Sequence, residues 1–121
     1  MRILVVDDSP VFLSAASDIL EAEGYEVELA PNGAEGVRLA RKLKPDLIIM
    51  DIEMPVMRGT QAAIEMRCDP EIRDIPIIAM TGVSPESLGE ESKLFNNYLV
   101  KPFGFAEMIP MVRSLTGKGS A

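Results

Sequence analysis

Residues 45–55 read PDLIIMDIEMP, and this stretch decides the fold. Its apolar run at positions 47–50 is continuous, which is typical of a strand buried on both faces of a parallel sheet. The run ends directly at Asp51, and Glu53 follows two residues later. In open α/β sheets, ligands bind outside the carboxyl ends of the strands. The stretch therefore predicts a buried strand that presents a carboxylate where a ligand would bind.

Short apolar runs alternate with helical patterns on both sides of this stretch. We expect strands at residues 3–6, 26–30, 46–50, 75–80 and 97–100, with 26–30 near the sheet edge because its polar and apolar residues alternate. We expect helices at 10–23, 34–43, 60–67 and 105–115. Ser9 and Pro10 favour the start of the first helix, and Gly24 favours its end. This order predicts an α/β fold, a doubly wound five-stranded parallel sheet with helices on both faces.

The segment at residues 84–96 is a weaker helix candidate than the others. Pro85 can start a helix, but Gly89 disfavours its interior, and several acids crowd like charge along it. We expect a short or frayed helix that is more mobile than the helix at 10–23. Pro110 also lies inside a helical pattern, where it removes one backbone hydrogen bond.

The 121 residues fit one domain, 1–121, which is long enough to bury a core without disulfides or metals. Cys68 is the only cysteine, so an internal disulfide is impossible. The tail from about residue 117 is expected to fray.

Composition excludes several classes of function. The chain has no histidine, which removes Ser-His-Asp triads and histidine-rich zinc sites. Its net charge is −7 and it has no basic stripe, so we expect no direct nucleic-acid binding. Its apolar runs are too short for a membrane span, and its N-terminus does not resemble a signal peptide, so we expect a cytoplasmic protein that does not bind membranes.

Polar residues gather at the carboxyl ends of four expected strands. Asp7 and Asp8 follow the first strand, Asp51 the third, Thr81 the fourth and Lys101 the fifth. Each residue alone is compatible with a turn, a helix cap or a solvated loop. Together they place three carboxylates, a hydroxyl and an ammonium at one rim of the sheet, which is strong evidence for a site.

These residue types favour metal-assisted phosphoryl chemistry. Three converging carboxylates repel one another, and a hard divalent cation such as Mg²⁺ removes that conflict through oxygen ligands. Phosphoryl transfer needs mainly positioning and charge neutralisation. With Mg²⁺ and Lys101 nearby, a phosphoryl group on one carboxylate would be held electrostatically, and Thr81 could donate a hydrogen bond to it.

The pattern resembles the response-regulator receiver family over almost the whole chain. The resemblance is carried by residues 3–8, 45–55, 59, 75–82 and 98–103. It implies a flavodoxin-like receiver fold of the chemotaxis-regulator type. It further implies a signalling switch that takes a phosphoryl group from a histidine kinase or histidine phosphotransfer protein and reshapes the face of its fourth helix, fifth strand and fifth helix for a downstream partner. It implies that the protein is not an enzyme, because a receiver catalyses only its own phosphoryl transfer and dephosphorylation.

The resemblance also implies a role for each site residue. Asp51 would be the phosphoacceptor, and Thr81 and Lys101 would engage the phosphoryl group. Tyr98 would change rotamer together with Thr81. The Mg²⁺ ligands would be Asp7, Asp8 and Asp51, with the carbonyl oxygen of Glu53 completing the set.

The sequence departs from the family pattern in a few places. Val56 and Arg58 stand where a glycine and an acid are often found, and Glu53 brings an extra carboxylate close to the phosphoryl site. The interval from Thr81 to Lys101 is a little short, and Asn96-Asn97 replaces a small-residue turn. These departures concern the output face more than the chemistry.

Three other functions compete with this interpretation. Residues 48–53 resemble the aspartyl-phosphate motif of haloacid-dehalogenase-type phosphatases, but those enzymes carry the nucleophile on the first strand. A flavodoxin-like FMN carrier would place its phosphate loop after the first strand, where Asp7 and Asp8 would repel it. A pseudo-receiver that only binds proteins would not need Asp51, Thr81 and Lys101 intact.

Overall fold

The computed structural model describes residues 1–54 and 57–117. Two sequence expectations lie outside the described residues: the departure at Val56, and the frayed tail beyond Gly117.

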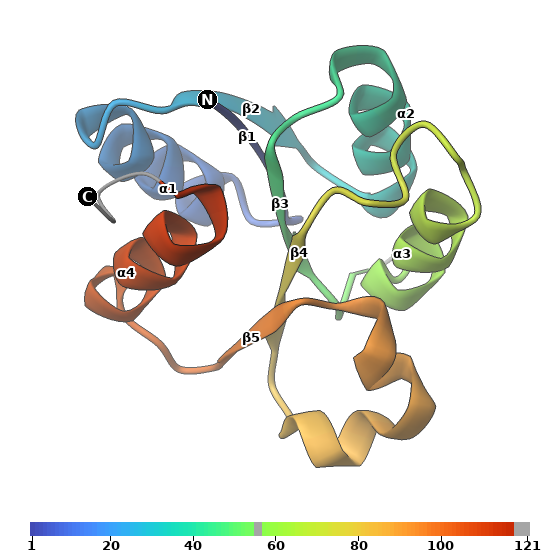
Figure 1. Ribbon diagram of the computed structural model, residues 1–121. Helices are drawn as coiled ribbons and strands as arrows, with labels where there is room; N and C mark the ends of the chain where they lie inside the picture. The colour runs from blue at the N-terminus through green and yellow to red at the C-terminus, as the bar shows by residue number, and fades with distance from the viewer. Residues whose placement is uncertain (55–56, 118–121) are drawn as a thin grey trace.

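Five parallel strands form one sheet in the order β2-β1-β3-β4-β5. The strands are β1 (Arg2–Val6), β2 (Glu26–Ala30), β3 (Leu47–Asp51), β4 (Ile77–Thr81) and β5 (Asn97–Val100). The helices are α1 (Pro10–Ala22), α2 (Gly33–Leu43), α3 (Gly59–Arg67), the 3₁₀ segment η1 (Pro85–Leu94) and α4 (Phe105–Thr116). Helices α1 and α4 cover one face of the sheet, while α2, α3 and η1 lie on the other (Figure 1). The predicted fold class is confirmed.

The buried strands supply side chains to both faces, as their continuous apolar runs predict. In β1, Ile3 and Val5 pack into the core on the α1–α4 side, whereas Leu4 and Val6 pack into the core on the α2–α3 side. β3 and β4 alternate between the two cores in the same way. Strand β2 has only one buried residue and lies at the sheet edge, which confirms the prediction from its alternating pattern.

Local chemistry sets the helix starts and strand ends. The Ser9 hydroxyl accepts a hydrogen bond from the Phe12 N–H at 3.3 Å and so caps α1, as predicted. Strand β4 begins at Ile77, two residues later than expected. The reason is that the Ile75 N–H bonds back to the Ile72 carbonyl in a turn, and Pro76 has no N–H to give to the sheet. Helix α4 runs through Pro110, which is exposed.

The weak helix predicted after Pro85 forms a kinked 3₁₀ segment. Gly89 breaks it with backbone angles of φ 60° and ψ −131°, a conformation that favours glycine. None of the ten residues of η1 is buried. This segment therefore contributes little apolar burial to stability, in contrast to α1, which buries three residues.

Gly59 allows the closest backbone approach next to Asp51. Its N–H donates to the carbonyl oxygen of Ile52 at 2.9 Å, at the first residue of α3. A Cβ atom on Gly59 would lie 2.3 Å from the carbonyl oxygen of Asp51 and 2.7 Å from the Cα of Ile52. The loop after β3 can therefore hold its course only if this residue has no side chain.

We predict that Gly59→Ala destabilises the protein by about 3 kcal/mol, because the clash is with backbone atoms that cannot rotate away. Urea denaturation measures the change. Gly104→Ala is the matched control, since a Cβ there meets only the Ala106 nitrogen, at 3.9 Å, and it should cost within about 1 kcal/mol. Equal losses in the two variants would contradict the close-packing argument.

Candidate functional site

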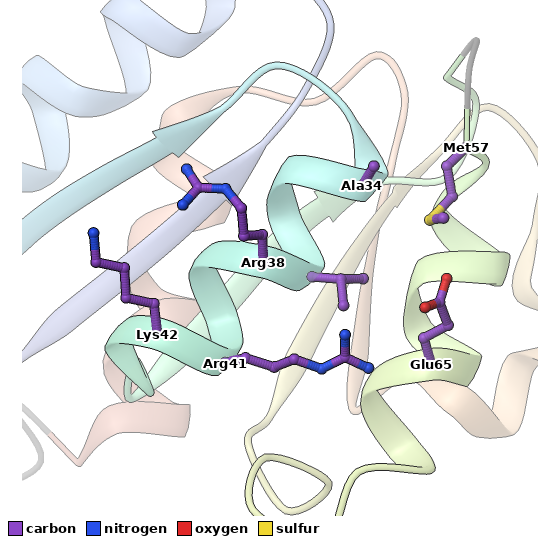
Figure 2. A pocket seen from close by; sticks show the side chains of 7 residues that line it. Ala34, Arg38, Arg41, Lys42, Met57 and Glu65 are labelled. Atoms are coloured by element: carbon purple, nitrogen blue, oxygen red, sulfur yellow. The ribbon is translucent and has the colours of Figure 1, made fainter.

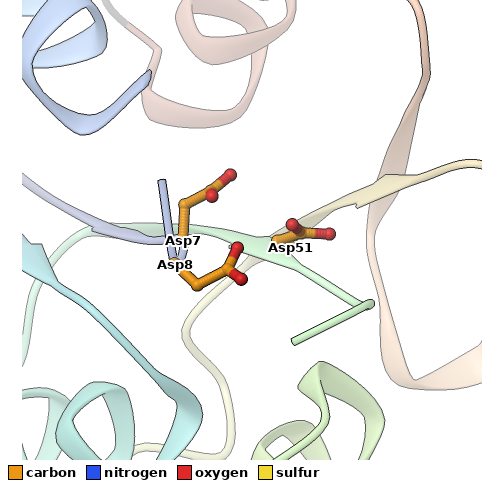
Figure 3. A group of neighbouring side chains, drawn as sticks. All are labelled: Asp7, Asp8 and Asp51. Atoms are coloured by element: carbon orange, nitrogen blue, oxygen red, sulfur yellow. The ribbon is translucent and has the colours of Figure 1, made fainter. Parts of the chain in front are cut away.

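Three acids meet at the carboxyl ends of β1 and β3. These strands are neighbours in the sheet, so Asp7 and Asp8 lie beside Asp51. Carboxylate oxygens of the three residues lie within 4.8 Å of one another. Figure 3 shows the three side chains gathered above the strand ends. Asp7 and Asp51 are buried, at 5 % and 2 % exposure, while Asp8 is exposed.

Hydrogen bonds fix the two buried carboxylates. The Ser9 N–H donates to Asp7 Oδ1 at 2.8 Å, and the Glu53 N–H donates to Asp51 Oδ1 at 3.0 Å. The Lys101 ammonium lies 3.1 Å from each carboxylate oxygen of Asp51. The lysine belongs to the loop after β5, two strands away from β3, and its side chain crosses the end of β4 to reach Asp51.

Burial raises the pKa of both acids. The pKa of Asp7 rises to about 6 because the carboxyl is buried; the Ser9 hydrogen bond opposes the rise and the charge of Asp51 adds to it. Burial also raises the pKa of Asp51, while hydrogen bonds from Lys101 and the Glu53 N–H favour its ionised form. The site thus contains acids that resist carrying their full charge.

This donor set fits a hard divalent cation. All three side chains offer oxygen, and a positive ion among them would offset both the burial and the mutual repulsion that raise the pKa of Asp7. The exposed side of the site, at Asp8, leaves room for water, which Mg²⁺ retains when it binds protein.

Thr81 stands at the end of β4, but its hydroxyl faces the following loop. It donates to the Val83 carbonyl at 3.1 Å and accepts from the Val83 N–H at 3.0 Å. Its side chain is fully buried. Thr81 therefore lies at the strand ends as predicted, but its hydroxyl is hydrogen-bonded to Val83 and not to Asp51.

Glu53 and Tyr98 make contacts that the sequence did not predict. The Glu53 carboxylate accepts a hydrogen bond from the Gly82 N–H at 3.0 Å, so its side chain joins the loops after β3 and β4. The Tyr98 hydroxyl donates to the carbonyl of Ser92 in η1, and its ring packs edge-on against Phe95.

An aromatic wall borders the acids and was missed by the sequence analysis. A hollow of about 470 Å³ is lined by the three acids and Lys101 together with Phe12, Phe103 and Phe105. Phe12 stacks on Phe105 at 5.9 Å and meets Phe103 edge-on at 6.2 Å. The chain has four phenylalanines, and three of them lie here. The sequence did contain a signal for this wall: Phe103 and Phe105 closely follow Lys101-Pro102, and Phe12 lies in the first turn of α1.

A second hollow, of about 450 Å³, lies between α2 and α3 (Figure 2). Two of its three basic residues are engaged elsewhere, since Arg38 pairs with Glu35 and Arg41 pairs with Asp69, and Lys42 is the third. The carboxylate of Glu65 faces the groove from α3. Among the described residues, the acids that cluster closely enough to hold a metal ion are Asp7, Asp8 and Asp51 at the strand ends, not the residues of this hollow.

Within residues 1–54 and 57–117, no helix is long and apolar enough to cross a membrane.

We predict that the metal-free protein becomes less stable as pH rises from about 4 to above 6. Its folded state favours neutral Asp7, whose pKa of about 6 exceeds the ordinary 3.8, so this stability is complete below pH 4 and is lost as pH passes 6. The difference between these two pKa values corresponds to roughly 3 kcal/mol. In urea denaturation with a metal chelator, the free energy of unfolding of Asp7→Asn should fall less steeply with rising pH than that of the wild type. Asp18→Asn, which alters an exposed acid on α1, is the control, and an unchanged slope in Asp7→Asn would contradict the assignment.

Comparison with known proteins identifies relatives over most of the chain. The protein-family model of the response regulator receiver domain matches residues 3–113. The chain is 37 % identical over 117 residues to the DNA-binding dual master transcriptional regulator RpaA of Synechocystis, covering 94 % of this chain but only 48 % of that protein. It is 41 % identical to protein PilH of Pseudomonas aeruginosa, covering 84 % and 85 % of the two chains.

Solved structures of receiver proteins also share the fold of this chain. The response regulator TrrA of Thermotoga maritima, crystallised in complex with Mg²⁺ and beryllium fluoride, superposes with a TM-score of 0.84 at 38 % identity, covering 94 % of this chain and 97 % of that one. Because sequence, fold and matched length agree, the protein belongs to the response regulator receiver family, the phosphorylation-controlled signalling domains of two-component systems.

Proposed function

We propose that Asp51 accepts a phosphoryl group, in a Mg²⁺-dependent reaction, from a phosphohistidine on a histidine kinase or phosphotransfer protein. The observation that carries the proposal is the environment of one carboxylate. Asp51 is buried, is held by Lys101 at 3.1 Å and lies beside two further acids that follow the neighbouring strand β1.

In this reaction, an oxygen of the Asp51 carboxylate attacks phosphorus, the phosphorus–nitrogen bond of the donor breaks, and the imidazole leaves and takes up a proton. The Glu53 N–H and the Lys101 ammonium already hold the attacking carboxylate, so little reorganisation is needed. Asp7, Asp8, Asp51 and the Glu53 carbonyl would hold Mg²⁺, which neutralises charge on the phosphoryl oxygens when bound.

Phosphorylation would then reset the contacts of the loop after β4. The Thr81 hydroxyl exchanges the Val83 carbonyl for a phosphoryl oxygen, and Tyr98 leaves the Ser92 carbonyl to turn inward. The surface formed by η1, β5 and α4 changes with it and is read by a downstream protein partner. Since η1 buries no residue, this rearrangement costs little apolar contact.

We further propose that the only reactions catalysed are phosphorylation and hydrolysis at Asp51 itself. The phosphatase alternative needs its nucleophile on the first strand, whereas Asp51 ends the third strand of the chain. An FMN phosphate is also disfavoured, because Asp7 and Asp8 occupy the loop where it would bind.

We predict that acetyl phosphate with Mg²⁺ adds one phosphate to the protein, and that Asp51→Asn abolishes the adduct. Intact-mass measurement detects it. Asp46→Asn, a change at the opposite end of the same strand, is the control and should label as the wild type does. An equal adduct on Asp51→Asn would refute the assignment.

We predict that Asp8→Ala weakens Mg²⁺ binding roughly tenfold or more, whereas Glu53→Ala leaves it nearly unchanged, because only the backbone carbonyl of Glu53 is expected to bind the ion. Isothermal titration calorimetry compares the two variants. The reverse order would mean that the ligand set is wrong.

A further inference from the structure

We propose that the Glu53 carboxylate is a charge-operated latch on the loop after β4. It holds the Gly82 N–H in the unphosphorylated protein and releases it when Asp51 is phosphorylated. This inference rests on the proposed function, because it concerns how phosphorylation of Asp51 reaches the loop that leads into η1.

Glu53 is hydrogen-bonded both to Asp51 and to the loop after β4. Its N–H donates to Asp51 Oδ1 at 3.0 Å, and its Oε1 accepts from the Gly82 N–H at 3.0 Å. Asp51 pairs with Met80 across the sheet, so Gly82 lies only two residues beyond the partner of Asp51. One residue therefore connects the phosphorylation position directly to the loop that follows Thr81.

Gly82 is fitted to this carboxylate. A Cβ atom at Gly82 would lie 2.9 Å from Glu53 Oε1, closer than real Cβ atoms come to a neighbour. The lack of a side chain is what lets the carboxylate reach the N–H. An alanine at this position would push the carboxylate away without changing any charge.

The charge balance around Glu53 makes the contact sensitive to phosphorylation. Among the described residues, the ion pair at this site joins Lys101 to Asp51, and Glu53 takes part in none. A phosphoryl group on Asp51 adds negative charge beside the residue whose N–H Asp51 binds. Like charges repel, so the free energy of the latched carboxylate rises when the group arrives. Because Glu53 and Gly82 are exposed, salt should screen this effect.

Release of the latch frees a donor where one is needed. The Gly82 N–H is adjacent to Thr81, whose hydroxyl is proposed to turn toward the phosphoryl group. A freed N–H next to a new anion is a hydrogen-bond donor for its oxygens. The Gly82 N–H therefore leaves the Glu53 carboxylate and joins the phosphoryl group in a single event, and the loop after β4 moves with it.

The test uses beryllofluoride with saturating Mg²⁺ as the phosphoryl analogue on the full chain. Glu53→Ala removes charge and acceptor, and Glu53→Gln keeps an acceptor without the charge. We expect beryllofluoride to bind roughly tenfold more tightly to Glu53→Ala and roughly threefold more tightly to Glu53→Gln, with smaller gains at 1 M salt, where the Debye length is about 3 Å. Glu86→Gln makes the same charge change on exposed η1 and should match the wild type.

A double-mutant cycle separates a latch from general repulsion. Gly82→Ala alone should also tighten beryllofluoride binding, because it displaces the carboxylate, and it should add nothing in the Glu53→Ala background. The amide resonance of Gly82 should move on beryllofluoride binding in the wild type and start from a shifted position in Glu53→Ala.

Additive effects in that cycle, or a Glu53→Ala variant that binds with the wild-type constant, would overturn the latch while leaving the proposed function intact. A wild type that binds no beryllofluoride and forms no phosphate adduct would overturn both.

Discussion

The structure depends on the burial of two like charges, Asp7 and Asp51, at one edge of a parallel sheet. The strand order places β1 and β3 side by side, so the two carboxylates cannot avoid each other. Burial raises the pKa of both, and Lys101 must cross the end of β4 to supply the nearest positive charge. A well-packed core on each face of the sheet stabilises an arrangement that is itself unfavourable, as functional sites commonly require.

The end of η1 that leads into β5 is held firmly. Arg67, at the end of α3, donates to the Leu94 carbonyl at 3.0 Å, to the Ile75 carbonyl at 2.7 Å and to Asn96 Oδ1 at 2.9 Å. Burial lowers the pKa of this guanidinium, yet it remains charged, and hydrogen bonds to a charged group are stronger than neutral ones. Segment η1 is thus anchored where it meets β5, so in the proposed mechanism a change at Asp51 acts on its other end, through the loop after β4.

Much of this could be predicted from the sequence, because apolar runs and the carboxyl-end rule depend only on residue type and order. They gave the five strands and the convergence of Asp7, Asp8 and Asp51. The start of β4 was misjudged because a turn bond from Ile75 competes with the sheet. The contact of Glu53 with Gly82 and the bonds of Arg67 to carbonyls were not predictable, since their partners are backbone atoms that every residue carries. The turn of Thr81 toward Val83 is likewise a choice of rotamer that no pattern encodes.

If Asp51 is phosphorylated as proposed, the charge count at the site explains why hydrogen-bond donors must be recruited to it. Three carboxylates and one ammonium leave an excess of two negative charges, which one divalent cation would cancel. A phosphoryl group then replaces a single carboxylate charge with about −1.5 to −2 and adds three acceptor oxygens. Lys101 and the proposed cation would already be committed, so the added charge would be met by neutral donors close by. The hydroxyl of Thr81 and the N–H of Gly82 are such donors, and both are engaged elsewhere in this structure. In the proposed mechanism, their release from Val83 and Glu53 is therefore the step at which a local change of charge becomes a change of shape.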